Sequence, residues 1–156
     1  MANDTQQIKC IILTLRKENV IVPNALVAEV ISVKDLEEIG NSPEWFLGKM
    51  KWRGADVPLL SFEAAGGEVI RKVNANTQAV VLYAVGKGDD VSENPYMGLV
   101  MSGVPHVSHI SRDQIIIDKE KSRDNPMVAR KVRINGASVS ILDVDAMVSM
   151  VSGLAA

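Results

Sequence analysis

The two histidines of the chain, His106 and His109, are the first candidates for metal binding or acid-base catalysis. A helix would place them on one face, but Pro105 and Val107 favour a strand, in which residues three apart point to opposite faces. A zinc site would also need a third ligand nearby, and the sequence signals none. We therefore expect a structural or surface role for both histidines and no metal site.

Cys10 is the only cysteine, which excludes an internal disulfide and a cysteine-based zinc site. Because it lies in the apolar segment IKCIILTL with no histidine near it, we expect a small buried hydrophobe rather than a nucleophile. Paired carboxylates can divide acid and base roles, but here solvation in loops or capping of helices explains each pair. The pairs are Asp89-Asp90, Glu37-Glu38 and Asp143/Asp145.

Glycine motifs give no phosphate site either. Gly66-Gly67 is not followed by the lysine and serine or threonine of a phosphate-binding loop, and no G-x-G-x-x-G occurs. No group of residues forms a catalytic constellation, and no motif signals a cofactor.

The segment PEWFLGKMKWRGADVP, residues 43–58, differs in kind because it holds both tryptophans of the chain. Arg53 follows Trp52 and precedes a glycine turn, so its guanidinium is expected at a rigid hairpin. Arginine and tryptophan are enriched at the energetic centres of protein interfaces. The alternative is that the tryptophans fill the core while Arg53 forms an ordinary surface ion pair, and composition leaves both interpretations open.

The elements that position these residues are mostly predicted strands. The segment 8–15 is almost entirely apolar and rich in β-branched residues, which predicts a buried strand. Further strand-like segments follow throughout the chain, and the pairs Gly54-Ala55 and Asn135-Gly136 predict tight hairpins. Near the end, Met147, Met150, Val151 and Leu154 recur at helical spacing, with Asp143 available as N-cap.

This pattern predicts an all-β fold with a C-terminal helix, built as paired small barrels. We expect one domain, 1–156, with a first lobe at about 16–78 and a second at about 79–141. The N-terminal strand and the C-terminal helix complete the lobes. The small, polar segment 63–78 is the predicted connection between the lobes, and the two halves show no obvious sequence repeat.

Charge and hydropathy exclude several partners. The net charge is −2, without the basic excess of a protein that neutralises phosphates, so we expect no nucleic-acid partner. The longest unbroken apolar run, residues 79–85, is far shorter than the roughly 20 residues that span a bilayer. Without a leader-like N-terminus either, the expectation is a cytoplasmic protein with no direct membrane insertion.

Residues 27–60, VAEVISVKDLEEIGNSPEWFLGKMKWRGADVPLL, resemble the signature region of CheW-like chemotaxis adaptor domains. That family shows a V-x-E-[VI] strand, a loop ending in [NT]-x-P-x-[FW]-[IL]-x-G, an R-G hairpin and a V-P-[LIV]-[LIV] strand. The later segments YMGLVMSGVPHVSHIS and GASVSILDVDAMV agree in order and with compatible spacing. The resemblance covers nearly the whole chain.

The resemblance implies two SH3-like five-stranded β-barrels and a non-enzymatic adaptor function. Such adaptors join the cytoplasmic tip of a chemoreceptor to the regulatory domain of a CheA-type histidine kinase, within membrane-associated receptor arrays. The implied receptor-binding residues are Val27, Gly48 and Arg53, with Trp52 as this chain's replacement for a leucine. The implied kinase-binding residues are Glu29 and Val30.

Several residues depart from the family pattern. Ser61, Phe62 and Glu63 stand where many members have D-L-R, and Ser102 replaces the aspartate of D-G-V. Lys51-Trp52 replace the common Asn-Leu, and the loops 86–95 and 119–126 are long and charged. The departures favour a divergent adaptor, similar to the auxiliary CheW-like proteins of type IV pilus (twitching motility) chemosensory systems.

Two other functions remain open from the sequence. One is a scaffolding subunit that binds kinase regulatory domains within arrays without coupling to a receptor. The other, from a different class, is a small β-barrel ligand binder or enzyme that uses the groove between the lobes. This second alternative predicts a polar pocket with a perturbed titratable group.

Overall fold

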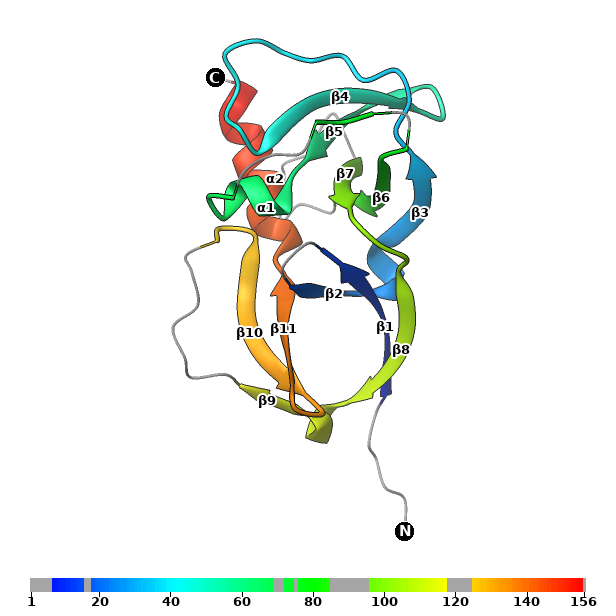
Figure 1. Ribbon diagram of the computed structural model, residues 1–156, viewed down its shortest axis with the longest axis vertical. Coiled ribbons are helices and arrows are strands. Elements are labelled where there is room, and N and C mark those ends of the chain that lie inside the picture. Colours follow the sequence, from blue (N-terminus) through cyan, green and yellow to red (C-terminus); the bar gives the residue numbers. More distant parts are fainter. Residues whose placement is uncertain are drawn as a thin grey trace.

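The computed structural model describes residues 7–15, 18–68, 72–74, 76–84, 96–117 and 125–155, which form a mostly β protein (Figure 1). The strands are β1 (Gln7–Thr14), β2 (Asn19–Pro23), β3 (Val27–Ser32), β4 (Phe46–Trp52), β5 (Ala55–Leu60), β6 (Gln78–Tyr83), β7 (Tyr96–Met101), β8 (His106–Ser111), β9 (Ile115–Ile117), β10 (Val128–Ile134) and β11 (Ala137–Leu142). The helices are α1 (Phe62–Ala65) and α2 (Val144–Ser152), with short 3-10 turns η1 (Asn24–Leu26), η2 (Arg112–Gln114) and η3 (Gly153–Ala155). The predicted all-β fold with a C-terminal helix is confirmed.

The strands form two sheets, one above the other in Figure 1, and each curves into a barrel-like lobe. The first lobe has the strand order β3-β6-β7-β5-β4, with five strands as expected. The second has six strands in the order β8-β1-β2-β11-β10-β9, because the short β9 adds an edge beside β10. Among the described strands, each lobe contains one parallel pair, β5 with β7 and β11 with β2, and the other pairs are antiparallel.

The sheets divide the chain differently from the expected lobes at 16–78 and 79–141. Strands β6 and β7, residues 78–101, pair with β3 and β5 in the first lobe, while β1 and β2 pair with β8 and β11 in the second. The segment 63–78 therefore joins two strands of one sheet and not two lobes. The crossing between lobes occurs instead from β2 to β3, through η1, and from β7 to β8.

Two hairpins, β4–β5 and β10–β11, have the same construction. Each first strand carries a bulge, between Phe46 and Gly48 in β4 and between Val128 and Arg130 in β10. After each second strand, the backbone N–H of one residue donates across the hairpin over 2.8 Å, from Ser61 to the Trp45 carbonyl and from Asp143 to the Met127 carbonyl. The side chains of Ser61 and Asp143 then cap α1 and α2, which confirms the predicted N-cap at Asp143.

The turns of these hairpins are Arg53-Gly54 and Asn135-Gly136, and both residues of each turn have positive φ. This is the two-residue turn whose twist suits a hairpin. The predicted turn at Asn135-Gly136 is correct. The prediction at Gly54-Ala55 was one residue too late, because Trp52 pairs with Ala55 and Arg53 itself occupies the left-handed region, with φ of 47°.

Three apolar clusters hold the structure together. The largest is shared by both lobes and α2, and includes Leu13, Phe62, Leu99 and Met147. A second fills the first barrel around Met50, and a third fills the second barrel around Val132. Because one core contains side chains from both lobes, the lobes are packed as a unit rather than linked as separate domains.

Cys10 and the two histidines, which were first considered for chemistry, lie on described strands. Cys10 is buried, and this burial raises the pKa of its thiol. Both histidines lie on β8 and are exposed. Across the described ranges, no group of three or more histidine, cysteine, aspartate or glutamate side chains is placed to hold a metal ion. Asp89-Asp90, the loop 86–95 and residues 119–124 lie outside the described residues.

Candidate functional site

The candidate site lies at the end of the first barrel where β4 finishes. Trp52, the last residue of β4, is only 8% exposed and packs in the core of this barrel. Because the ring is buried, Trp52 itself offers little surface to a binding partner. Trp45, by contrast, packs at the edge of the shared core and against Phe46, with ring centroids 6.3 Å apart.

Glu29 comes to Trp52 from the opposite edge of the sheet. It lies on β3 just after a bulge between Val27 and Glu29, and such bulges re-aim the side chains that follow them. The indole Nε1 of Trp52 donates a hydrogen bond of 2.9 Å to Glu29 Oε1. Since β3 and β4 are the two edge strands of this sheet, the bond joins its edges and helps to close the barrel.

Arg53 completes the group at the turn. Its Nη2 lies 3.3 Å from the same Glu29 Oε1 that accepts from Trp52, and its guanidinium carbon lies 4.8 Å from the centre of the Trp52 ring. The guanidinium is thus held by a carboxylate and by an aromatic face. The Arg53 side chain is nevertheless 70% exposed, so most of its donors face solvent. We call Glu29, Trp52 and Arg53 the edge triad.

Two tyrosines that the sequence analysis did not select extend the edge triad across the sheet. Tyr96 packs edge-on against Trp52 with ring centroids 4.7 Å apart, and Tyr83 lies 5.6 Å from Tyr96. Tyr83 is 40% exposed. Both tyrosines lie at paired strand ends, since Tyr83 is the last residue of β6 and Tyr96 the first of β7. A signal existed, because these are the only tyrosines in the chain and aromatic residues with a polar end suit interfaces.

Gly48, one of the implied receptor-binding residues, is required by the fold itself. It is buried, and its close neighbour belongs to the same chain. A Cβ at this position would lie 2.3 Å from the Glu37 carbonyl oxygen, and its φ is 138°. The glycine permits the backbone of Glu37 to bond with Lys49 in both directions, at 2.8 and 3.0 Å.

The remaining predicted site residues lie on β3. Val27 is half-buried and packs against the shared core. Val30 is 36% exposed at the edge strand. The structure therefore brings Glu29, Trp52 and Arg53 together and leaves Val27 and Val30 nearby on the same strand as Glu29. Gly48 is buried within β4 and lies against Glu37.

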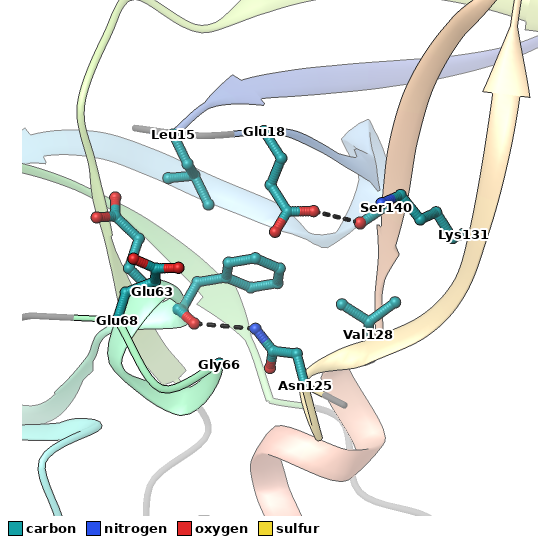
Figure 2. Close-up of a pocket in the computed structure, with 10 residues that line it drawn as sticks. Leu15, Glu18, Glu63, Gly66, Glu68, Asn125, Val128, Lys131 and Ser140 are labelled. Carbon is teal, nitrogen blue, oxygen red and sulfur yellow. Dashed lines mark hydrogen bonds between the residues drawn. The ribbon is translucent and has the colours of Figure 1, made fainter. Parts of the chain in front are cut away.

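A recess of about 240 Å³ lies between the lobes (Figure 2). The sequence left open a small-ligand site in this region. The wall of the recess joins α1 of the first lobe to the second lobe through Asn125, whose Nδ2 donates to the Phe62 carbonyl over 3.0 Å. Glu18 enters from the other side and accepts a 2.5 Å hydrogen bond from Ser140. Among the described residues, the displaced pKa values are those of Cys10 and of the surface pair Lys51 and Asp56.

The surface pair next to the edge triad is an ordinary exposed salt bridge. Lys51 and Asp56 face each other across the first hairpin and form a salt bridge. Their hydrogen bond raises the pKa of Lys51 and lowers that of Asp56. Both side chains are more than half exposed, and exposed pairs of this kind contribute little to stability.

Comparison with known proteins identifies the family. The model of the CheW-like domain matches residues 9–152, which is nearly the whole chain. The chain belongs to the CheW-like domain family. This places it among the CheW-like scaffold and adaptor domains of chemotaxis signalling.

A structural comparison agrees with this CheW-like domain assignment. The chain is similar to the crystal structure of the scaffolding protein TtCheW from Thermoanaerobacter tengcongensis, with a TM-score of 0.69 and 18% identity. The match covers 88% of this chain and 90% of that one, and at this identity it establishes the fold. No curated protein sequence matches this CheW-like domain. No helix within the described ranges is long and apolar enough to cross a membrane.

Proposed function

We propose that this CheW-like domain is a non-enzymatic adaptor that couples the cytoplasmic tip of a chemoreceptor to the regulatory domain of a CheA-type histidine kinase. The observation that carries the proposal is the edge triad. An exposed arginine is fixed on a rigid turn by a carboxylate and an indole, which is the composition of an interface centre. We also propose that the protein is cytoplasmic and is recruited to membrane-associated receptor arrays, because its proposed partners lie there.

The proposed receptor contacts centre on Arg53. Four of its five N–H donors remain available when Nη2 contacts Glu29, so it can bind a carboxylate of a receptor helix without leaving the triad. Val27 and Trp52 support this surface from β3 and β4. Gly48 contributes indirectly, because it allows the segment at Glu37 to lie against β4.

The proposed kinase contacts are Glu29 and Val30 on the edge strand β3. An edge strand presents unpaired backbone groups, and a second β domain can pair or pack against it. Val30 supplies exposed apolar surface there, and the exposed part of Glu29 supplies charge.

The adaptor adds no bond chemistry to signalling. It couples the two partners because it binds both, and any signal from the receptor must appear as a difference between its contacts with the active and inactive kinase. The shared core supports such coupling, since it packs the two lobes as one unit.

Arg53→Ala tests this proposal. We expect the substitution to weaken binding of a chemoreceptor cytoplasmic fragment by about tenfold or more, since truncation of an interface anchor costs about 2 kcal/mol. Binding of the kinase regulatory domain should change little. The measurement is titration calorimetry with each purified partner alone, together with thermal unfolding of the variant.

The matched control is Asn135→Ala in the equivalent turn of the second hairpin. It changes the same turn position in a lobe that lacks the triad and should leave receptor binding unaltered. Unchanged receptor binding by Arg53→Ala, at equal thermal stability, would contradict the adaptor proposal.

The pathway is proposed to be a type IV pilus (twitching motility) system, with this domain as an auxiliary adaptor of the ChpC kind. Support comes from the departures at Ser61, Glu63, Ser102 and Trp52. A deletion of the gene should impair twitching and leave flagellar swimming intact in the source organism. The opposite pattern would assign the adaptor to flagellar chemotaxis.

A second candidate function is scaffolding without receptor coupling. It is favoured by Ile116 and Ile117, which are 66% and 54% exposed on the edge strand β9 at the far end of the second lobe. A scaffold would bind kinase regulatory domains and show no affinity for the receptor fragment. Binding assays with each partner separately distinguish the two functions.

A further inference from the structure

The two matching hairpins show what the fold requires at the triad positions. At the end of β10, Ile134 occupies the place that Trp52 has in β4, and Asn135 occupies the place of Arg53. Ile134 is half-buried and Asn135 adopts φ of 52° without an arginine. A barrel of this kind therefore closes with an aliphatic residue and a common turn residue. The tryptophan and arginine of the first hairpin need another explanation.

The side-chain contacts of Trp52 supply that explanation. Glu29 Oε1 accepts from Trp52 Nε1 at 2.9 Å and lies 3.3 Å from Arg53 Nη2. The Trp52 donor is buried, with the residue 8% exposed, while the side chains of Glu29 and Arg53 are 41% and 70% exposed. An exposed ion pair is ordinarily mobile and weak, but here one partner is fixed from below by a buried donor.

The same ring also restrains Arg53. Its guanidinium carbon lies 4.8 Å from the centre of the indole ring, and Tyr96 packs edge-on against the same indole, with ring centroids 4.7 Å apart. Trp52 thus contacts both members of the exposed pair, one through its N–H and one through its ring face. Restraining side chains before binding reduces the conformational entropy that an interface loses.

We propose that Trp52 is a positioning residue that holds Glu29 and Arg53 as one preformed ion pair, with both side chains in the arrangement that the partners bind. The proposal rests on the adaptor function above, in which Arg53 faces the receptor and Glu29 faces the kinase. Because Trp52 contacts Glu29 through its N–H and Arg53 through its ring, both surfaces depend on this one residue. Substitution of Trp52 therefore weakens binding of both partners at once, although the ring itself is buried.

Trp52→Phe is the first test, because phenylalanine keeps an aromatic ring in the barrel and removes the N–H. We expect the affinities for the chemoreceptor cytoplasmic fragment and for the kinase regulatory domain each to fall about three- to tenfold. Trp45→Phe is the matched control and should change both affinities by less than about twofold. Unchanged affinities in Trp52→Phe, or a loss for only one partner, would overturn the proposal.

A double substitution separates positioning from simple packing. If Trp52 acts through Glu29, adding Trp52→Phe to Glu29→Ala should cost no further receptor affinity, within about twofold. If Trp52 only fills the barrel, the two losses multiply and the proposal fails. Arg53→Ala reports on the adaptor function itself: intact receptor binding in that variant refutes the adaptor, whatever Trp52 does.

A spectroscopic measurement on the isolated protein does not depend on any partner or on folding of Trp52→Phe. The chain has two indole N–H groups, in Trp45 and Trp52. Glu29→Ala should speed hydrogen exchange of the Trp52 indole at least about tenfold and leave that of Trp45 unchanged. Equal exchange of the Trp52 indole in wild type and Glu29→Ala would show that the bond does not fix Glu29.

Discussion

The first and second hairpins, β4–β5 and β10–β11, have nearly the same backbone structure. They share the lengths of both strands, the position of the bulge, a two-residue turn with positive φ, the hydrogen bond that follows the second strand and the N-cap of the next helix. They differ where the first hairpin has Gly48, Trp52 and Arg53 and the second has Arg130, Ile134 and Asn135.

This difference separates the residues that a hairpin turn of this type requires from those that it does not require. The second hairpin shows that a turn of this type closes with asparagine, which tolerates the left-handed conformation better than arginine does. The first hairpin places an arginine in that conformation and fixes it with Glu29 and Trp52. We infer that the arginine is retained for its contacts rather than for the turn.

Gly48→Ala should show the largest effect on stability. The new Cβ would meet the Glu37 carbonyl at 2.3 Å in a backbone conformation with φ of 138°, so we expect a loss of about 2–4 kcal/mol in the free energy of unfolding. Arg130→Ala, at the matching position of β10, should change it by less than about 0.5 kcal/mol. Urea unfolding measures both, and equal effects would show that the two bulges have the same requirements.

Exchange of the residues at the two turns should have a moderate effect on stability, with opposite signs in the two hairpins. Arg53→Asn replaces a strained residue by one suited to positive φ, and we expect it to leave stability unchanged or raise it by up to about 1 kcal/mol. Asn135→Arg should lower stability by a similar amount. A loss of stability in Arg53→Asn would indicate that the triad holds the barrel together more strongly than the turn strains it.

The helix caps should show the smallest difference. Ser61 Oγ accepts from Ala64 N at 3.1 Å, and Asp143 Oδ1 accepts from Ala146 N at 2.9 Å. Removal of such a cap costs about 1 kcal/mol. We expect Asp143→Ala to cost slightly more than Ser61→Ala, because a charged cap also favours the N-terminus of the longer helix α2. Thermal unfolding of the two variants tests the order.

The sequence predicted the elements well where local patterns decide them. The apolar segment 8–15, the Asn135-Gly136 turn and the Asp143 cap were predicted correctly, because periodicity and turn chemistry act over a few residues. The turn at Arg53-Gly54 was displaced by one residue, since an arginine with positive φ breaks the usual preference. The lobe boundaries could not be derived in this way, because they depend on which distant strands pair.

The internal repeat carried a signal in the sequence that was too sparse to recognise. Between residues 43–65 and 125–147, the matching positions hold many similar residues. The identical pairs are Lys49/Lys131, Gly54/Gly136, Ala55/Ala137, Val57/Val139, Leu60/Leu142 and Ala64/Ala146. Only the shared bulge and turn geometry makes the alignment evident, since the apolar positions tolerate exchange among similar volumes.

The departures from the family pattern also become clearer in three dimensions. Ser102 Oγ lies 3.4 Å from Glu63 Oε1, so the serine that replaces an aspartate faces the glutamate that replaces an arginine. Two acids at these positions would repel one another, and the serine removes that repulsion. Ser61, which also replaces an aspartate, keeps its role as a cap. The sequence showed three separate changes, and the fold joins two of them into a compensating pair.

The site itself was partly predictable. The resemblance selected Glu29, Trp52 and Arg53, and the structure brings these three together. Their shared oxygen could not be foreseen, because it depends on the edges of a sheet meeting across 23 residues of sequence. The sequence could not show why position 48 is a glycine, since the atom that excludes a side chain there belongs to Glu37.

Simultaneous binding of two partners tests the central claim most directly. The wild-type chain is mixed with a chemoreceptor cytoplasmic fragment and a CheA-type regulatory domain, and the complexes are measured by sedimentation. The adaptor function predicts one species that contains all three proteins and loses the receptor fragment in Arg53→Ala but not in Asn135→Ala. Binding of only one partner by the wild-type chain, or mutual exclusion of the two, would contradict the account.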